Sequence, residues 1–246
     1  MSGRTPKILL FQAREPGDPM LDHELRCFAE RCELSPDAFV SVNMAEADLS
    51  SELLEGPDAV MVGGAGEYSV VEGGFDWHES MLELMRAVAR KRMPMFASCF
   101  GFQALVQAFG GTVETVSHMS KLGTYEVTLT DAGRRDPIFG AHPDTFDAQF
   151  GHNDSATELP DELVLLARSE RCPHQAVRFQ DAPIVATQFH PELCAQDNIE
   201  RYIAYLQNYE AAAISREQAE EKALQMHRPS PHASHLLREF VKELLA

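Results

Sequence analysis

The sequence lacks long apolar runs and clusters of basic residues, and each absence excludes a class of protein. The apolar run at residues 8–11 is too short for the core of a signal peptide. No stretch approaches the roughly 18 apolar residues of a membrane-spanning helix. No run is rich in lysine or arginine, and neutralising the phosphates of a nucleic acid requires clustered cations. We therefore expect a cytoplasmic protein without a membrane or nucleic-acid partner.

Cysteine is sparse and follows no familiar spacing. The 246 residues contain 5 cysteines, an odd number, and no Cys-x-x-Cys pair. A disulfide framework or a zinc ribbon is therefore not expected, and the thiols should be mostly reduced. His232 and His235 have the spacing of some metal ligands, but no neighbouring cysteine or carboxylate completes a ligand shell. We expect no bound metal.

What the sequence does contain is enough apolar residues, 44% of the total, for one substantial domain with an appendage. Up to residue 99, predicted strands alternate with predicted helices, and the last two strands are near-continuous apolar runs. Such runs are typical of parallel strands covered on both faces. We predict an α/β fold with an open, mostly parallel sheet covered by helices on both faces and with sites at the carboxyl ends of its strands. The predicted strands are 7–13, 39–44, 59–63 and 94–99, and the predicted helices are 22–33 and 77–90.

The pattern changes in the second half of the chain. Residues 112–190 hold several β-rich runs separated by turn residues, which predicts antiparallel strands added to the sheet or beside it. The chain then turns helical, and Ser215 followed by Gln218 has the spacing of a capping box. We predict one domain over 1–196 and a C-terminal helical extension over 197–246, packed on the same domain or at an interface between subunits.

Cys99 lies where a predicted strand passes directly into a predicted helix. A nucleophile elbow is a sharp, strained turn at such a junction, and it needs small residues two positions before and two positions after the nucleophile. Ala97 and Gly101 satisfy this requirement. The N–H groups at the start of the helix would favour the reactive thiolate. The local pattern also fits an inert core cysteine, so it leaves both interpretations open.

His190 and Glu192 form a second candidate group in the stretch TQFHPEL. Pro191 favours an extended conformation for the histidine before it. If a strand continues over 187–190, alternate side chains place His190 and Glu192 on the same side. A carboxylate so placed accepts one imidazole N–H and leaves the other nitrogen free as a base, as in a catalytic triad. A surface histidine beside an unrelated glutamate is the alternative.

A glycine-rich loop, GGAG at residues 63–66, follows the predicted strand at 59–63. Glycines let a backbone approach a ligand closely. Amides of this loop, together with the amide of Phe100, would form an oxyanion hole. The spacing matches neither a Walker loop nor GxGxxG, so nucleotide binding is not indicated. A plain βα loop is the alternative interpretation.

The combination and order of these three elements resemble the class I glutamine amidotransferase family. Its members typically have G-x-C-x-G-x-Q at the elbow, F-H-P-E further on and G-G-P-G in the early loop, and this sequence has ASCFGFQ, FHPE and GGAG. Ala97 and Ala65 replace the usual glycine and proline, and both are small. The resemblance covers about residues 7–195 and is strongest to stand-alone, GMP-synthase-like members. It implies a flavodoxin-like fold.

The resemblance also implies a role for each matching residue. Cys99 would attack the γ-carboxamide of glutamine to give a γ-glutamyl thioester, His190 would take the thiol proton and later activate water, and Glu192 would orient His190. The amides of Gly64 and Phe100 would hold the oxyanion. The resemblance further implies substrate contacts for Gln103, Gly66 and His152.

The implied activity is hydrolysis of glutamine, or of another γ-glutamyl amide, with release of ammonia for an acceptor. About 50 helical residues follow the predicted core, fewer than a separate synthetase domain usually needs, so a separate synthase subunit would carry the acceptor. The alternative is a stand-alone γ-glutamyl hydrolase or peptidase that uses water alone. A non-catalytic binding role is less favoured, because all three triad residues are present. We expect no cofactor, and association with a second copy stays open.

Overall fold

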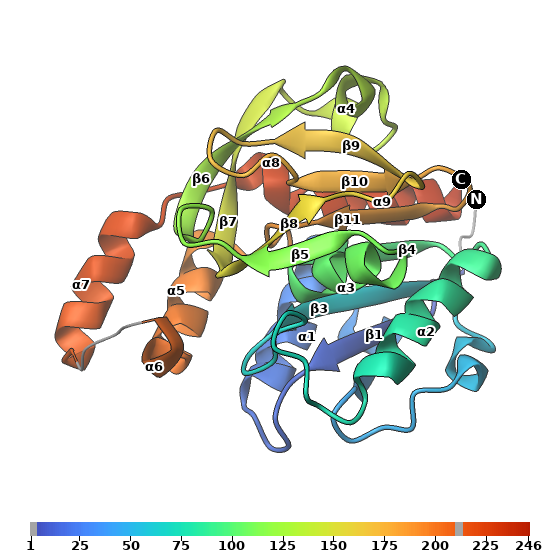
Figure 1. Ribbon diagram of the computed structural model, residues 1–246, viewed down its shortest axis with the longest axis horizontal. Coiled ribbons are helices and arrows are strands. Elements are labelled where there is room, and N and C mark those ends of the chain that lie inside the picture. The colour runs from blue at the N-terminus through green and yellow to red at the C-terminus, as the bar shows by residue number, and fades with distance from the viewer. Residues whose placement is uncertain (1–3, 210–213) are drawn as a thin grey trace.

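The computed structural model describes residues 4–209 and 214–246 and is built on a nine-stranded sheet (Figure 1). A parallel half has the order β2-β1-β3-β4-β11, and an antiparallel half continues it as β10-β9-β6-β7. Strands β5 and β8 form a separate antiparallel pair. The strands are β1 (Ile8–Ala13), β2 (Phe39–Asn43), β3 (Ala59–Ala65), β4 (Met95–Ser98), β5 (Thr112–Thr115), β6 (Lys121–Leu129), β7 (Thr145–His152), β8 (Asp154–Glu158), β9 (Leu163–Arg168), β10 (Ala176–Phe179) and β11 (Ile184–Thr187).

The prediction of a large, mostly parallel sheet with helices on both faces is confirmed. Alternation of side chains along a strand divides the core in two: Leu9 and Phe11 of β1 belong to one apolar cluster, and Ile8 and Leu10 belong to the other. Helices α2 and α3 cover the first face, and α1 and α9 cover the second. These helices are α1 (Met20–Cys32), α2 (His78–Arg90), α3 (Phe100–Ala108) and α9 (Leu236–Leu245).

Strand β11 departs from the antiparallel pattern expected for the second half of the chain. It pairs antiparallel with β10 but parallel with β4, so it brings a late segment beside the strand that leads to Cys99. It also ends at Thr187, and the prediction that a strand continues over 187–190 was wrong. The hydroxyl of Thr187 donates to Phe189 O at 2.8 Å as the chain turns away, and Pro191 has no N–H for a strand ladder.

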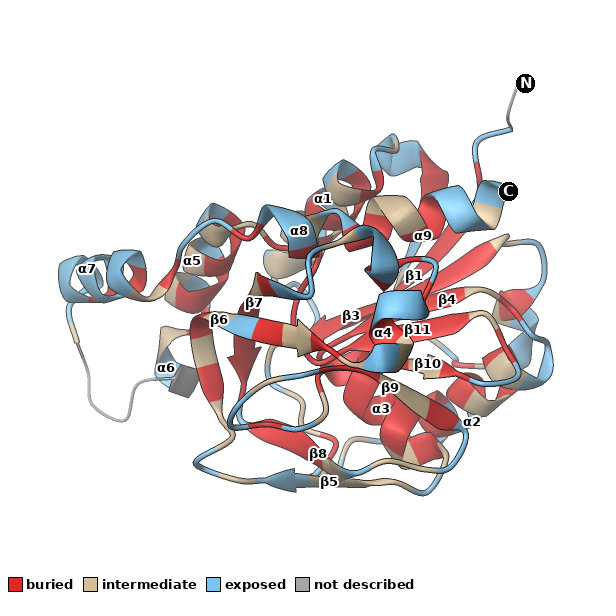
Figure 2. Ribbon diagram, turned by 90° about the horizontal axis from the view of Figure 1, so that it is seen from above, coloured by how far each residue is buried: buried red, intermediate tan, exposed pale blue. Residues whose placement is uncertain are grey.

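The last part of the chain is helical as predicted, although residues 210–213 of the predicted stretch lie outside the described residues. The predicted capping box is present: Ser215 N–H donates to Gln218 Oε1 at 2.9 Å, and Gln218 N–H donates to Ser215 Oγ at 3.2 Å. Helix α7 stands at one end of the molecule, where it packs on α5 and on the end of β6 (Figures 1 and 2). The remaining helices are α4 (Asp131–Arg135), α5 (Ala195–Ala204), α6 (Leu206–Tyr209), α7 (Arg216–Met226) and α8 (Pro231–Ser234), with short 3-10 turns at Pro36–Ala38, Ser51–Leu54 and Phe139–Ala141.

Over the residues that the structure describes, every helix is too short or too polar to cross a lipid bilayer. Helix α9 is amphipathic and packs its apolar side on the sheet and on α1 instead. Phe240 is buried, and its ring centroid lies 5.7 Å from that of Phe96 in β4. At least this part of the C-terminal helical region therefore belongs to the core of the same chain.

Replacing Phe240 with alanine tests whether α9 unfolds together with the sheet. Truncating a buried phenylalanine leaves a cavity, so we expect the free energy of unfolding to fall by about 3 kcal/mol. Urea denaturation followed by circular dichroism measures this change. Leu245→Ala is the matched control, because Leu245 on the same helix is exposed. An unchanged midpoint for Phe240→Ala would show that α9 is not part of the cooperative core.

Candidate active site

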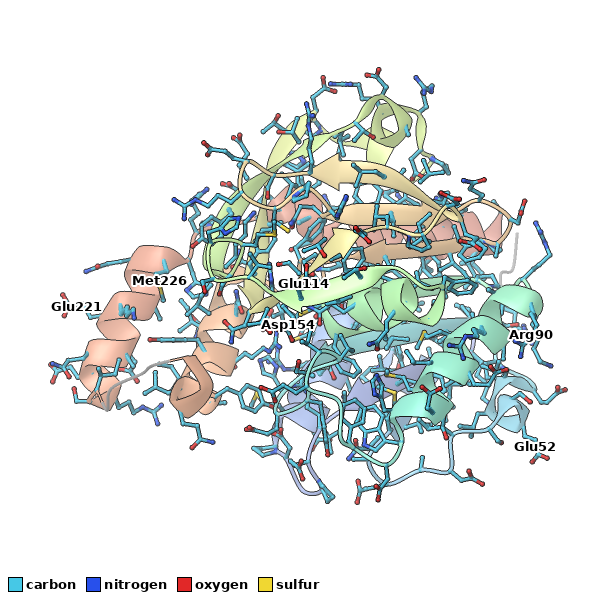
Figure 3. All side chains as sticks on the ribbon, viewed as in Figure 1. Glu52, Arg90, Glu114, Asp154, Glu221 and Met226 are labelled. Atoms are coloured by element: carbon cyan, nitrogen blue, oxygen red, sulfur yellow. The ribbon has the colours of Figure 1, made fainter. Side chains whose placement is uncertain are left out.

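Three neighbouring parallel strands end at the same edge of the sheet and bring distant segments together. β3 ends in the glycine-rich loop, β4 leads into Cys99, and β11 is followed by the segment that holds His190. A cavity of about 320 Å³ opens beside Cys99. Asp154, labelled in Figure 3, is one of its lining residues. The lining also includes Ala65, Gly66, Glu67, Phe100, Gln103, Gly151 and His152.

Cys99 has the backbone of a strained strand-to-helix turn. Its φ is 48° and its ψ is −99°, and it is the N-cap of α3, a conformation that non-glycine residues rarely adopt. The Cys99 N–H donates to Thr187 O at 2.8 Å, which joins the turn to β11. A Cβ on Gly101 would lie 2.8 Å from the Cβ of Val62 and 3.0 Å from its carbonyl oxygen. Only glycine fits there, so the tight approach of α3 to β3 explains the sequence pattern around Cys99.

The Cys99 thiol is buried and lines the cavity. Its Sγ lies 4.0 Å from Gly151 O and 3.9 Å from Gln188 Nε2. Burial raises the pKa of the thiol to about 11, although the charge of Arg201 and the Phe100 N–H act in the opposite direction. The position of Cys99 at the start of a helix predicted a thiolate, because the helix N–H groups lower a thiol pKa. Desolvation raises the pKa by more than these N–H groups lower it. A proton acceptor is therefore needed to generate the nucleophile.

His190 and Glu192 form a fully buried pair. His190 Nδ1 lies 2.7 Å from Glu192 Oε1. Burial lowers the pKa of His190 well below its usual value, and the charge of Arg201 lowers it further. Burial raises the pKa of Glu192 to about 7. The predicted pairing of His190 with Glu192 is thus present, although a turn after β11 produces it rather than a continued strand. The neutral imidazole donates its Nδ1–H to the carboxylate.

Arg201 of α5 is the residue at this site that the sequence reasoning missed. It is 4% exposed, its Nη1 lies 2.6 Å from His190 Nε2, and its Nη2 donates to Ala65 O at 2.9 Å. In the part of the chain that the structure describes, the His190 ring has no hydrogen bond with the Cys99 thiol. The signal that would have found Arg201 is its place on the face of α5 that also carries the buried Asn198 and Tyr202.

The glycine-rich loop is held by a buried ion pair, which sequence reasoning also missed. Glu24 of α1 accepts from Arg14 Nη2 at 2.8 Å and from the Gly64 N–H at 3.1 Å. The expected oxyanion role for Gly64 is therefore corrected, because its N–H already has an acceptor. A Cβ on Gly64 would lie 2.8 Å from His190 Cε1, so this glycine instead makes room for the imidazole. The Phe100 N–H does point at the Cys99 sulfur.

Gln103 and His152 both line the cavity, as does Gly66. Gln103 Nε2 donates to Asp154 O at 2.8 Å, which fixes its side chain. His152 Nδ1 lies 2.9 Å from the same carbonyl, so this nitrogen is the donor. Burial lowers the pKa of His152 to about 3, and its Nε2 is buried without a partner among the described residues. His152 is therefore a neutral side chain with a free acceptor, rather than a solvated loop residue.

One further cluster has the composition of a metal site. Ligand atoms of His23, Cys27 and Asp197 lie within 4.8 Å of one another. However, Asp197 accepts from Arg31 at 2.9 Å and from Arg26 at 3.3 Å, and burial raises the pKa of the Cys27 thiol far above its usual value. A protonated thiol and a carboxylate paired with two guanidinium groups make this an ion-pair network that holds α5 against α1.

Together, the doubly covered sheet, the strained cysteine at the end of β4 and the histidine–glutamate pair after β11 have the arrangement that the sequence resemblance implies. Residues 30–208 match the family model described as glutamine amidotransferase class-I, and the chain belongs to this family. The resemblance found in the sequence is confirmed.

Relatives and solved structures agree with this placement. The chain is 37% identical over 101 residues to one subunit of the glutamine-hydrolysing GMP synthase of Methanopyrus kandleri, covering 41% of this chain and 52% of that one. It is 30% identical over 143 residues to the corresponding subunit from Methanospirillum hungatei, covering 58% and 68%. The chain thus spans about half the length of the first relative, and about a fifth of two Thermosipho GMP synthases.

The fold is similar to that of a glutamine amidotransferase from Thermotoga maritima, with a TM-score of 0.73 and 21% identity over 98% of this chain and 99% of that one. A glutamine amidotransferase from Methylobacillus flagellatus gives a TM-score of 0.69 and 17% identity, covering 98% and 96%. At these identities the likeness concerns the fold alone, and it includes the C-terminal helices.

Proposed function

We propose that the chain hydrolyses the side-chain amide of glutamine, with Cys99 as nucleophile, His190 as base and Glu192 as the residue that orients His190. The observation that carries the proposal is the 2.7 Å contact between His190 Nδ1 and Glu192 Oε1, beside the strand end that presents Cys99 to the cavity. A nucleophile, a base and an orienting carboxylate are the elements of a hydrolytic triad. Membership of the class I glutamine amidotransferase family supports the same reaction.

The reaction begins when His190 Nε2 accepts the proton of the Cys99 thiol while Sγ attacks the amide carbon. The carbonyl electrons move to the oxygen, and the Phe100 N–H donates to the resulting oxyanion. The imidazolium then gives its proton to the departing nitrogen, the C–N bond breaks, and ammonia and a γ-glutamyl thioester remain. A water molecule that loses its proton to His190 attacks the thioester, which releases glutamate and restores the thiol.

Three cavity residues complete the proposed binding site. The unpartnered Nε2 of His152 offers an acceptor to an N–H of the substrate. Gln103 lies one helical turn beyond Cys99, and its amide is already oriented by Asp154. Gly66 borders the same cavity, so its small size leaves room for a substrate.

We further propose that the ammonia passes to an acceptor on a separate synthase subunit. The relatives with 37% and 30% identity are each named as a lettered subunit of a glutamine-hydrolysing GMP synthase, and such a name implies that a second subunit exists. If the chain instead acts alone with water as the acceptor, a γ-glutamyl peptide would be the better substrate.

The purified protein, assayed beside Cys99→Ala, tests the proposal. We expect wild type to release equal amounts of glutamate and ammonia from glutamine, and the variant to release neither above background. The same assay with a γ-glutamyl dipeptide decides between the two substrate classes. Full turnover of the dipeptide with none of glutamine would replace the amidotransferase function by that of a peptidase.

A further inference from the structure

A cavity of about 670 Å³, separate from the active site, lies between β6 and the turn that follows β9 (Figure 1). The two strands pair at Thr128 with Arg168 and at Leu129 with Ala167. Both pairs lie at the C-terminal end of β6, and the cavity opens beside the earlier part of the strand. Four basic side chains line it, although the chain carries a net charge of −17. The lining residues are Lys121, Thr124, Tyr125, Glu126, Thr128, Arg168, Ser169, Glu170, Arg171 and Arg228.

Lys121 is a buried cation whose contacts in this cavity are uncharged. It is 3% exposed, and its ammonium group donates to the hydroxyl of Ser169. Its Nζ also lies 4.6 Å from the ring centroid of Phe150 and 5.3 Å from that of Tyr125. In the part of the chain that the structure describes, Lys121 forms no ion pair. Because desolvation opposes an unpaired buried charge, such an ammonium group normally has a carboxylate beside it.

Arg171 adds a second positive charge to the same cavity. Burial lowers the pKa of Lys121 to about 8; the Cys172 thiol acts in the opposite direction, and the charge of Arg171 lowers the pKa further. A thiol supplies a counter-charge only after it ionises. Over residues 4–209 and 214–246, neither Arg171 nor Arg168 makes a hydrogen bond or an ion pair. Lys121 and Arg171 therefore face each other as like charges.

The carboxylates near the cavity do not neutralise these two cations. Arg228 pairs with Asp147 at 2.6 Å. This contact raises the pKa of Arg228, and the charge of Glu126 raises it further. Glu170 is exposed and forms no ion pair with any residue that the structure describes. The cavity thus holds two facing cations without a counter-charge from the described chain.

We propose that this cavity binds a phosphate group, either free or carried by a small organic molecule. Two facing cations call for two negative charges. A phosphate monoester carries about two near neutral pH, whereas a carboxylate carries one. The guanidinium of Arg171 provides a planar set of donors that suits phosphate oxygens, and Lys121 provides a point charge. A volume of about 670 Å³ is in the range of small-molecule sites.

The proposed phosphate site lies next to the active-site cavity. Lys121 is opposite His152 in the pairing of β6 with β7. The ring centroid of His152 lies 5.8 Å from that of Phe150, the ring that the Lys121 ammonium also contacts. Burial is the main cause of the low pKa of His152, and the charge of Lys121 lowers it further. A phosphate bound to Lys121 would offset that charge, so the two cavities are electrostatically linked. The binding itself does not depend on the proposed function.

NMR of the lysine side chains tests the site without any substrate. In protein labelled with ¹³C in its lysines, each Cε signal reports the protonation of one ammonium group, and the signal lost in Lys121→Met identifies Lys121. We expect the acid dissociation constant of Lys121 to fall at least about tenfold with saturating inorganic phosphate or adenosine monophosphate, because a facing negative charge favours the ammonium form. The other lysines should keep their values; they are Lys7, Lys91, Lys222 and Lys242.

Two matched variants and two control solutes make the experiment specific. Arg171→Met and Arg135→Met each replace an exposed arginine, but Arg135 on α4 does not belong to the lining of the cavity. Arg171→Met should bind phosphate at least about tenfold more weakly, because it loses hydrogen bonds from a charged donor, whereas Arg135→Met should bind it like wild type. Adenosine lacks the phosphate and should leave the Lys121 signal unchanged. Sodium chloride at the same ionic strength should also leave it unchanged.

Each outcome decides for or against the site. An unchanged Lys121 signal with both phosphate compounds overturns it and would point to an acidic segment of a protein partner instead. An effect of undiminished strength in Arg171→Met, or one that sodium chloride reproduces, overturns it as well. Tighter binding of adenosine monophosphate than of inorganic phosphate supports an organic phosphate as ligand, and equal binding supports free phosphate. Because no outcome requires glutamine hydrolysis, this site and the proposed function can fail independently.

Discussion

Replacing Cys99 with serine should lower the rate of glutamine hydrolysis by about 10⁴-fold while leaving the fold intact, as expected for removal of a catalytic nucleophile. Serine has nearly the same volume as cysteine, and the φ of 48° at this position strains both residues equally. The hydroxyl, however, is far less acidic than the thiol. His190, whose pKa burial lowers well below its usual value, is too weak a base to ionise it.

The measurement is the initial rate of ammonia release at saturating glutamine, with a thermal unfolding curve for each variant. Cys194→Ser is the control, because Cys194 is the N-cap of α5 and serine is a favoured N-cap residue. This control should retain the wild-type rate. If Cys99→Ser kept more than a tenth of the wild-type rate, the nucleophile would have to be another residue.

The sequence predicted those parts of the site that short-range backbone geometry determines. The small residues around Cys99 follow from one sharp turn, and the Gly101 contact with Val62 shows why the turn tolerates so little volume. Strands β3 and β4 were predictable because burial on both faces demands continuous apolar runs, whereas β11 was expected among the antiparallel strands and instead pairs parallel with β4. His190 and Glu192 were also identified, although Pro191 places them together through a turn rather than through the pleat of a strand.

The remaining features depend on packing between segments far apart in the sequence. Nothing near Gly64 shows that Glu24 of α1 takes its N–H, and nothing near Arg201 shows that its guanidinium lies on a histidine of another loop. The ionisation of Cys99 was misjudged for the same reason. The start of a helix is visible in a sequence, but the desolvation that raises the thiol pKa to about 11 comes from the whole surrounding structure.

Glu192→Gln should lower the rate of glutamine hydrolysis by about 10³-fold and should also change its dependence on pH. The carboxylate of Glu192 accepts from His190 Nδ1 and so leaves Nε2 unprotonated. A glutamine can donate its NH₂ group to Nδ1. The imidazole proton is then on Nε2, so Nε2 can no longer act as a base. The same change of tautomer explains the loss of activity when the triad aspartate of a serine protease becomes asparagine.

The ionised form of Glu192 that the reaction needs is the form that is less favourable for the stability of the fold. Burial raises the pKa of Glu192 to about 7, so the folded chain binds this proton more tightly than the unfolded chain does. The contribution of Glu192 to stability is therefore fully present below the unfolded pKa of about 4.5 and decreases as the pH rises to about 7. Activity and stability therefore favour different protonation states of Glu192: the reaction needs the carboxylate, whereas folding favours the carboxylic acid.

The pH dependence of the rate follows from the two forms of Glu192. The carboxylate predominates above pH 7 and the carboxylic acid below it. The acid donates to Nδ1 and imposes the wrong tautomer, so the wild-type rate should fall about tenfold per pH unit below 7. Glu192→Gln cannot titrate, so its residual rate should lose this dependence between about pH 5.5 and 7, whereas Glu200→Gln, at an exposed acid on α5, should keep it. A low-pH decline that persisted unchanged in Glu192→Gln would show that a different group controls the tautomer of His190.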